Sequence, residues 1–501
     1  MITCPHCNSN SIQKRGSTFN KAGVNSRRYS CNDCHKWFSD KKETKFDADI
    51  KFDDDIFVIT SAQNNTKINT KFFKSLLTYC EINQARLIVL PSRYLVETKV
   101  DPKWDPILLP YMVDKNIKIS TKLRVLGEIN LLPTIENPLM GLDYLSKVDS
   151  LVIGHPQLQI RSIAVNATDS AAILTTTGTI TKPNYTKTKQ GLKAEFNHSY
   201  SAIVVERDGD AFHTRVLNAD KNGNFYDING FYSQEKYNKN VQADAIVLGD
   251  THALFIDPEV KAATFTNKDS IINVLKPKQI LHHDLVDCFS ISHHHQKNFF
   301  ARYGKYKIGL NSIEDELNDV ISLLRETTPN NSKLVVISSN HNDHLRQWLN
   351  SADPKLDPVN AKIYYYLMYL MLDGLETGDK KFSYPNPFEI WISQNAPELD
   401  IEWIGSRSSY KIHGIECGSH GDIGAGGSRG SNIGFSKLAQ KYITGHSHSP
   451  SIYRGAWQNG TSSLLKLEYN QGASSWLHAH TVIYPNGCRQ MIFIIDGKWK
   501  I

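Results

Sequence analysis

The sequence predicts an α/β protein with a small metal-bound module in front and a larger sheet-based region behind. Four cysteines occur as two close pairs within the first 34 residues. From residue 56 onward, short apolar runs typical of buried strands alternate with helical periodicities. The chain has 501 residues, more than one domain usually holds, and its 40% hydrophobic and 22% charged residues are an ordinary globular balance. Several folded units are therefore expected.

The cysteine pairs predict a zinc ribbon over residues 1–45. Cys4-Pro-His-Cys7 and Cys31-Asn-Asp-Cys34 enclose 23 residues. Two such knuckles place four thiolates around one structural Zn²⁺, and a segment this short has little other means of building a core. The remaining cysteines are scattered and are expected to be buried thiols: Cys80, Cys288, Cys417 and Cys488.

Positive charge is concentrated in this same segment. The formal net charge is +6, and residues 1–45 carry nine Lys/Arg against three Asp/Glu, so nine minus three accounts for all of it. Arg27 and Arg28 stand beside Tyr29, and Trp37 and Phe38 follow. Cations interleaved with aromatics favour binding to a polyanion such as DNA. The segment resembles the zinc ribbons of transposases and some phage proteins. A purely structural or protein-binding ribbon is the alternative.

Three further regions are expected behind the ribbon. Residues 46–170 are expected to form an α/β accessory region. They begin with an acidic linker, and their patterns then predict a strand over 56–60, a helix over 72–80 and a strand over 86–90. Residues 171–240 are β-rich, with a hairpin over 202–205 and 214–217 and a basic loop over 182–193. Residues 241–501 form the third region. No internal repeat is evident.

No membrane contact is expected. No stretch approaches the roughly 20 apolar residues that span a bilayer. The N-terminal residues lead directly into the cysteine motif without an apolar signal segment. A soluble protein of the cytoplasm is the expectation, and it leaves room for a homo-oligomer.

Side chains of metal-ligand type follow successive apolar runs of the last region. The runs are 245–248, 276–281, 334–337 and 442–443. Loops after parallel strands meet at one sheet edge, and Asp, His and Asn suit two divalent ions, Mn²⁺ first, with Fe²⁺ or Zn²⁺ possible. In an extended segment, residues i and i+2 share a face, which favours the two x-separated pairs. The candidate ligands are Asp250, His252, Asp284, Asn340, His420, His446 and His448.

These motifs resemble those of calcineurin-like metallophosphoesterases, a family that includes the Mre-type DNA-repair nucleases. The residues concerned are Gly249–His252, Ser339–His341 and Gly445–His448, and the resemblance covers roughly residues 241–460. It implies a β-sandwich flanked by helices that holds two divalent ions about 3.5–4 Å apart. Asp250, His252 and His448 would bind one ion; Asn340, His420 and His446 would bind the other, with Asp284 bridging. The resemblance also makes His341 the proton donor to the leaving oxygen.

The sequence departs from that family's pattern in the residues around the ligands. His283 stands before Asp284, and Ser339 before Asn340, where the family has glycine. The acid expected after His341 comes one residue late, as Asp343. Asp343 and Asp287 are both candidates for orienting His341.

A glycine-rich loop over 418–430 contains one cation, Arg429. It suits close approach of backbone to a phosphate, with Arg429 contacting the substrate, and it suits a tight turn equally well. The other histidines, including His282, His283 and the run 293–295, are expected to be structural or exposed.

The whole chain also resembles the pre-early host-DNA-degrading proteins of T5-like phages. The resulting hypothesis is a metal-dependent DNase that acts on DNA in the bacterial host cytoplasm. A phosphomonoesterase or protein phosphatase on the same scaffold is the first alternative. A DNA-binding regulator with a vestigial site is the second, and the complete ligand set argues against it.

Overall fold

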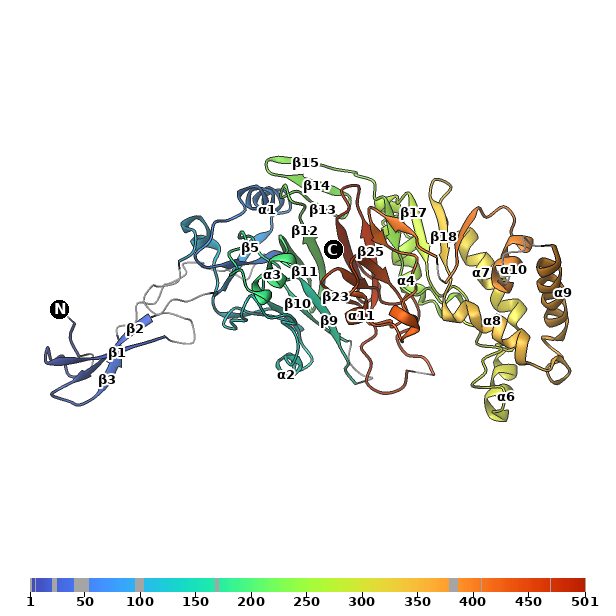
Figure 1. Ribbon diagram of the computed structural model, residues 1–501, viewed down its shortest axis with the longest axis horizontal. Helices are drawn as coiled ribbons and strands as arrows, with labels where there is room; N and C mark the ends of the chain where they lie inside the picture. The colour runs from blue at the N-terminus through green and yellow to red at the C-terminus, as the bar shows by residue number, and fades with distance from the viewer. Residues whose placement is uncertain are drawn as a thin grey trace.

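The computed structural model describes residues 2–4, 6–19, 25–39, 54–94, 103–166, 171–377, 386–406, 408–468 and 470–500. Its strands form two three-stranded sheets and two ten-stranded sheets. One small sheet lies at one end of the molecule, and the helices α6 to α10 lie at the other, with the large sheets between them (Figure 1). The acidic linker expected at 47–55 falls almost wholly outside the described residues.

The first small sheet is the predicted ribbon. Its order is β1-β2-β3, all antiparallel. The stacked rings of Tyr29 and Phe38, 5.5 Å apart, are its main apolar contact. The strands are β1 (Ile12–Phe19), β2 (Asn25–Cys31) and β3 (Trp37–Ser39).

The first large sheet has the order β20-β21-β22-β24-β23-β9-β10-β8-β7-β6. It takes five strands from each half of the chain, joined by the antiparallel pair β23 and β9. The strands are β6 (Asn116–Ser120), β7 (Leu123–Leu126), β8 (Ser150–Ile153), β9 (Gln159–Ile163), β10 (Ala172–Thr176), β20 (Lys411–Ile412), β21 (Ile415–Glu416), β22 (Lys441–Thr444), β23 (Ser451–Tyr453) and β24 (Ala456–Gln458).

The second large sheet has the order β19-β18-β17-β16-β25-β26-β12-β11-β4-β5. Here β26 and β12 join the two halves, again antiparallel. The strands are β4 (Ile56–Gln63), β5 (Arg86–Ser92), β11 (Ser201–Asp208), β12 (Ala211–Asn218), β16 (Ala245–Val247), β17 (Gln279–His282), β18 (Lys333–Ile337), β19 (Ile401–Ile404), β25 (His478–Ile483) and β26 (Arg489–Ile494).

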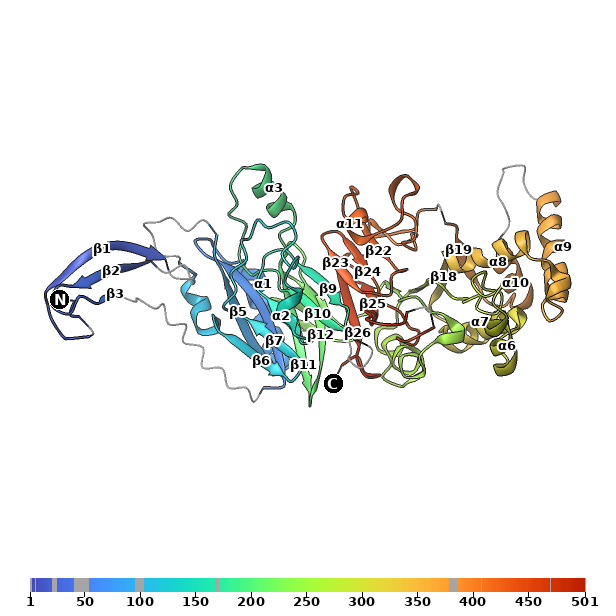
Figure 2. The same ribbon diagram turned by 90° about the horizontal axis from the view of Figure 1, so that it is seen from below.

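A single hydrophobic core fills the space between the two large sheets. It contains Phe57, Ile160, Val247, Ile443 and Phe493, all 3% exposed or less, from strands of both sheets and both halves. Figure 2 shows the strands of the two halves following one another across the centre of the molecule. Both sheets therefore run across the predicted boundaries at 170/171 and 240/241, and separate folding of those regions stays a prediction.

Helices cover the outer faces of the second sheet. Helix α1 (Thr70–Ile82) packs on β4, β5, β11 and β12, and α4 (Pro258–Lys261) with α5 (Ile271–Leu275) packs on β16, β25 and β26. A larger helical layer covers β18 and β19. Its members are α7 (Ile313–Thr327), α8 (Asn340–Ser351), α9 (Ala361–Thr377) and α10 (Pro387–Asn395), with α6 (Phe299–Ile308) beyond them.

Most elements expected from the sequence are present. The strand–helix–strand unit over 56–90 is β4-α1-β5 with its strands parallel, and the hairpin is β11-β12 in register through Asp208 and Ala211. The prediction of a basic loop over 182–193 is partly wrong, because Lys189–Phe196 forms helix α3, which the Thr188 side chain caps. The remaining small sheet, β13 (Phe225–Asp227), β14 (Gly230–Ser233) and β15 (Lys236–Asn238), connects the two halves. Within the described residues, no helix is long and apolar enough to cross a membrane.

Candidate metal centre

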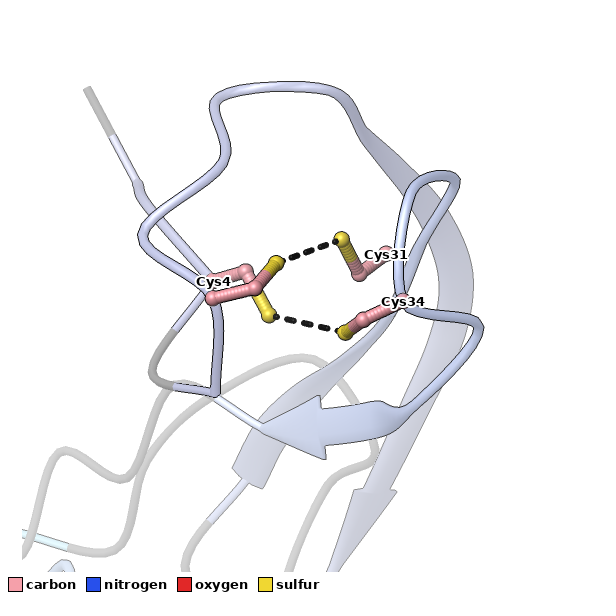
Figure 3. A group of neighbouring side chains, drawn as sticks. Cys4, Cys31 and Cys34 are labelled. Carbon is pink, nitrogen blue, oxygen red and sulfur yellow. Dashed lines mark hydrogen bonds between the residues drawn. The ribbon is translucent and has the colours of Figure 1, made fainter.

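The ribbon brings its four cysteines together at one point. The Sγ atoms of Cys4 and Cys34 lie 3.6 Å apart, and those of Cys7 and Cys31 lie 3.5 Å apart (Figure 3). All four sulfurs lie within 4.8 Å of one another. Four thiolates about 2.3 Å from one Zn²⁺ have very nearly these separations. The residues present therefore fit one structural zinc ion.

The seven predicted ligands in residues 241–501 also converge. Asp250 and His252 follow β16, and Asp284 follows its neighbour β17, whereas His448 follows β22 of the other large sheet. The Nε2 atom of His448 lies 3.1 Å from Nε2 of His252 and 3.1 Å from Asp250 Oδ2. One ligand atom from each of these four residues lies within 4.8 Å of the others, and all four residues are buried. This is the first ligand group.

A second ligand group lies on the other side of Asp284. The Oδ1 atom of Asn340 is 3.0 Å from His420 Nε2 and 3.1 Å from His446 Nδ1. Asn340 is the first residue of α8, where the side chain of the N-cap residue Ser339 accepts a hydrogen bond from the backbone N–H of Asn342. Asn340 and His446 are half-buried, so this group faces solvent more than the first.

Asp284 lies between the two groups. Its Oδ2 atom is 3.2 Å from His420 Nε2 and 3.9 Å from His252 Nε2. Its Oδ1 atom is buried and has no hydrogen-bond partner within the described residues, and the same holds for Asp250 Oδ1. Buried carboxylate oxygens without partners are costly, and a cation satisfies them. The donor set therefore fits two divalent ions that share Asp284.

The electrostatics of the site favour bound cations. Burial raises the pKa of the Asp284 carboxyl, but His420 and His341 outweigh it and hold the pKa well below its usual range. Burial lowers the pKa of His252, yet Asp287, Asp284 and Asp250 together raise it to about 9. Bound metal ions would neutralise the same carboxylates that these histidines face.

Four of the ligands have a left-handed backbone. The φ angles of His252, Asp284, His446 and His448 are +50°, +43°, +76° and +57°. Such conformations are unfavourable for residues with a Cβ and concentrate at functional sites. The extended geometry expected for the x-separated pairs is therefore wrong: sharp turns after the strands aim these side chains at the centre. Gly445, directly after β22, allows the close approach to Asp250, because a Cβ there would lie 2.1 Å from Asp250 Oδ1.

The structure decides which acid orients the proposed proton donor. Nδ1 of His341 lies 3.1 Å from the main-chain oxygen of Asp287, and the ring of His341 is 4.9 Å from that of His252. The carboxylate of Asp287 bonds to His252 Nδ1 at 3.0 Å and so directs the opposite nitrogen, Nε2, toward the ligand group. Asp343 instead pairs with Arg346.

Two further aromatic rings, those of His283 and Trp476, lie beside the site. His283 is fully buried, its ring is 5.5 Å from that of His420, and neither ring nitrogen has a hydrogen-bond partner within the described residues. Burial and the neighbouring His420 lower the pKa of His283 to about 4, which keeps it neutral. Trp476 packs 4.1 Å from the ring of His448. The one available signal was the position of His283 directly before Asp284.

The predicted substrate contacts lie on the surface. Arg27 and Arg28 are exposed on β2 of the ribbon, and Arg429 is exposed in the glycine-rich loop. The loop contains tight turns: Gly426 and Gly427 have φ of +65° and +79°, and a Cβ at Gly430 would lie 1.8 Å from the oxygen of Gly421. The steric need for glycine is thus shown, and contact of these arginines with a substrate stays a prediction.

Together, fold and site define a mixed α/β protein with a four-cysteine cluster and an Asp/His centre suited to metal ions. The chain is 32% identical to Protein A1 of Escherichia phage T5 over 463 residues, which cover 88% of this chain and 82% of that protein. The chain belongs to the family of this phage protein.

No protein-family model matches the chain. Among solved structures, Vps29 of Chaetomium thermophilum in complex with a cyclic peptide shares 13% identity and covers 37% of this chain and 98% of its own, with a TM-score of 0.22. A second structure of the same Vps29 shares 10% identity and covers 37% and 97%, with a TM-score of 0.21.

Proposed function

We propose that the protein is a metallophosphoesterase of the calcineurin-like class that hydrolyses the phosphodiester bonds of DNA. The observation that carries the proposal is the position of Asp284 between two ligand groups, with His341 beside them. Seven ligands of Asp, His and Asn type sharing one carboxylate are the arrangement that phosphoryl-transfer chemistry with two metal ions requires. Manganese is the metal that we expect, since it suits mixed oxygen and imidazole ligands.

The residues would act on the substrate as follows. Asp250, His252, Asp284 and His448 would hold one ion, and Asp284, Asn340, His420 and His446 the other; when bound, the ions supply Lewis-acid activation and neutralise phosphoryl charge. Water would add to phosphorus and release one proton to solvent as the bond from phosphorus to the leaving sugar oxygen breaks. His341, whose Nδ1–H donates to the main-chain oxygen of Asp287, presents Nε2 and gives its proton to that leaving oxygen.

The ribbon supports DNA as the substrate. Its arginines Arg27 and Arg28 are exposed, and Trp37 presents 59% of its surface to solvent while the guanidinium of Arg15 lies 5.7 Å from its ring. Cations bind the phosphate backbone, and exposed aromatic rings stack on bases. The module would deliver the catalytic region to DNA.

A groove between the two halves of the chain offers a second DNA contact. It has a volume of about 520 Å³ and is lined by Lys189, Leu192, Lys193, Phe196, Asn197, Ser436 and Arg454. Phe196 is 89% exposed, and Glu136 is the acid that pairs with Lys193 and Arg454. Arg454 directly follows β23 and stands six residues after His448, so at most about 20 Å of extended chain separates it from the metal centre. About six nucleotides of a DNA strand would cover that length.

The test is incubation of the full-length protein with linear and closed circular DNA, with Mn²⁺ and with a chelator. We expect Mn²⁺-dependent cleavage, and cleavage of an aryl phosphodiester faster than of the matched monoester. Intact DNA together with rapid monoester hydrolysis would establish the phosphatase instead, and binding of DNA without any hydrolysis would establish a regulator. Action in the bacterial host cytoplasm is part of the proposal and follows from the phage family.

A further inference from the structure

The strand orders of both large sheets read the same from the centre outward. In the first sheet, strands at equal steps from the junction of β23 and β9 are equivalent: β24 and β10, β22 and β8, β21 and β7, and β20 and β6. In the second sheet, the equivalent strands on either side of the junction of β26 and β12 are β25 and β11, β16 and β4, and β17 and β5. Each set of nine strands follows the same order along the chain. The absence of a repeat inferred from the sequence is therefore wrong at the level of structure.

The strand directions obey the same symmetry. β4 and β5 are parallel, as are β16 and β17; β9 and β10 are antiparallel, as are β23 and β24. The β8 and β10 pair is parallel, like that of β22 and β24. Both junctions are antiparallel, as a local two-fold axis requires. Helix α1 between β4 and β5 corresponds to α4 and α5 between β16 and β17.

Matching hydrogen bonds fix the correspondence residue by residue. The hydroxyl of Thr179 donates to the main-chain oxygen of Ser61 at 2.9 Å, and the hydroxyl of Thr461 donates to that of Asp250 at 3.0 Å. Each threonine follows a glycine, and each hydroxyl lies within 2.9 Å of the hydroxyl two residues later. Ser61 therefore occupies the place of Asp250.

The ladder registers fix the second motif. Thr176 pairs with Ile153 as Gln458 pairs with Thr444, so the next residues, Gly154-His155, correspond to Gly445-His446. Counting on from these positions, Gln63 stands for His252 and Gln157 for His448. The main-chain N–H of Asn64 donates to Ser92 as that of Ala253 donates to Leu285, which places Pro91 at the position of Asp284. Strand β18, which precedes Asn340, has no counterpart in the first set.

Protein groups fill the equivalent site in the first set. The Gln63 side chain bonds to Asn184 at 3.0 Å and to the Tyr185 hydroxyl at 3.4 Å. The two ring nitrogens of His155 lie 3.4 Å and 3.3 Å from main-chain oxygens of Gln157 and Leu132. The left-handed turns that aim the ligands are also gone, because Gln63, Pro91, His155 and Gln157 all have negative φ.

We infer that residues 56–218 and 245–494 are two copies of one structural unit, and that the first copy has lost its metal site to a closed hydrogen-bond network. Each chain then holds one two-metal centre, in the second copy, and His155 is a retained ligand residue with no metal to bind. The inference concerns metal binding and stands whatever the substrate proves to be.

The test compares two histidines at equivalent positions. Metal content is measured by mass spectrometry on Mn²⁺-loaded full-length protein, for wild type, His155→Ala and His446→Ala. We expect about three ions in wild type, one of them the ribbon zinc. His155→Ala should keep all three and hydrolyse an aryl phosphodiester normally, whereas His446→Ala should lose Mn²⁺. More than three ions in wild type, or Mn²⁺ loss in His155→Ala without a change in melting temperature, would overturn the inference.

Two further variants guard against misfolding and test the correspondence directly. Asp284→Asn combined with His446→Asn and His448→Asn removes ligands of both groups and should leave only the ribbon zinc; a retained Mn²⁺ ion would place a working site in the first copy. Ser61→Asp with Gln157→His restores ligands on either side of His155 and should add Mn²⁺ binding. If this variant melts like wild type but binds no additional Mn²⁺, the residue correspondence is wrong.

Discussion

The main-chain oxygen of Asp287 lies 3.1 Å from Nδ1 of His341, while the carboxylate of the same residue bonds to His252 at 3.0 Å. One acidic residue thus positions the proposed proton donor and a ligand of the first group. The backbone contact holds Nδ1 of His341 and leaves Nε2 as the nitrogen that would face the leaving group.

His341→Ala should keep both metal ions and lose activity on DNA by about 10²–10⁴-fold, the usual contribution of a positioned acid. Activity on an aryl phosphodiester whose leaving group needs no proton should be nearly normal. Steady-state rates on both substrates and metal analysis provide the measurement. His344→Ala, whose ring lies 5.0 Å from that of His341, is the matched control. Loss of metal in His341→Ala would show that His341 is a ligand.

Asp284→Asn should lower the occupancy of both ions and abolish turnover, because this carboxylate lies between the two ligand groups. Metal content and DNA cleavage are measured on the same preparation. Asp343→Asn is the control, since that acid pairs with Arg346 and should leave the metal content unchanged. A variant that retains both ions would contradict the bridging role.

Cys31→Ser should release about one zinc ion and unfold the ribbon, because metal binding supplies the folding free energy of such a module. Zinc release is followed with a chromogenic chelator, and Cys80→Ser in α1 is the control. Activity on a small phosphodiester should survive, while the apparent KM for DNA should rise. That rise should shrink with added salt, which already weakens the wild-type contact. Unchanged zinc in Cys31→Ser would rule out the four-cysteine site.

Replacing Lys189 and Lys193 by glutamate should raise the KM for DNA several-fold and leave kcat on an aryl diester unchanged, since the groove touches only the polyanion. The same reversal at Lys118 and Lys122 on the first copy is a control for net charge. Equal effects of the two pairs would mean that the groove has no specific role in DNA binding.

Asp227→Asn should destabilise the protein by about 3 kcal/mol, because it removes a partner of the buried Arg215 guanidinium, whose Nε lies 2.9 Å away. Burial raises the pKa of Asp227, but Arg215, Tyr79 and Gln490 outweigh it and lower the pKa below 3.8. Its contribution is therefore complete above pH 3.8 and disappears as pH falls through the lower folded value. Thermal melting of the variant should depend less on pH below about 4 than that of wild type.

The ligands could be predicted from the sequence because each follows a strand whose apolar pattern is local. Asp250 comes directly after the apolar or small run 245–249, Asp284 comes three residues after Leu281, and parallel strands deliver their ends to one sheet edge. The cysteine spacing predicted the ribbon for the same reason. In both cases the metal-binding residues lie within a few positions of the strand or turn that places them.

The pairing of the two halves could not be predicted in this way. β9 and β23 lie nearly 300 residues apart, and no local periodicity records which strands meet. The repeat was also hidden, because Ser61, Pro91 and Gln157 have replaced the residues that would have revealed it. What survives is Gly154-His155 and Gly178-Thr179, pairs too short to stand out. Likewise, the sequence could not show whether Asp287 or Asp343 orients His341. The contact is made by the main-chain oxygen of Asp287, which does not depend on the residue type.

The junction of β12 with β26 and β9 with β23 has a consequence for expression of the protein in pieces. Each of these strands would be the outermost strand of its own copy, and in the intact chain each is covered by its counterpart. A fragment holding either copy alone would present two open strand edges, whose unpaired N–H and C=O groups recruit other chains. Isolated halves should therefore aggregate or pair with themselves, and mixing them early during refolding should rescue solubility.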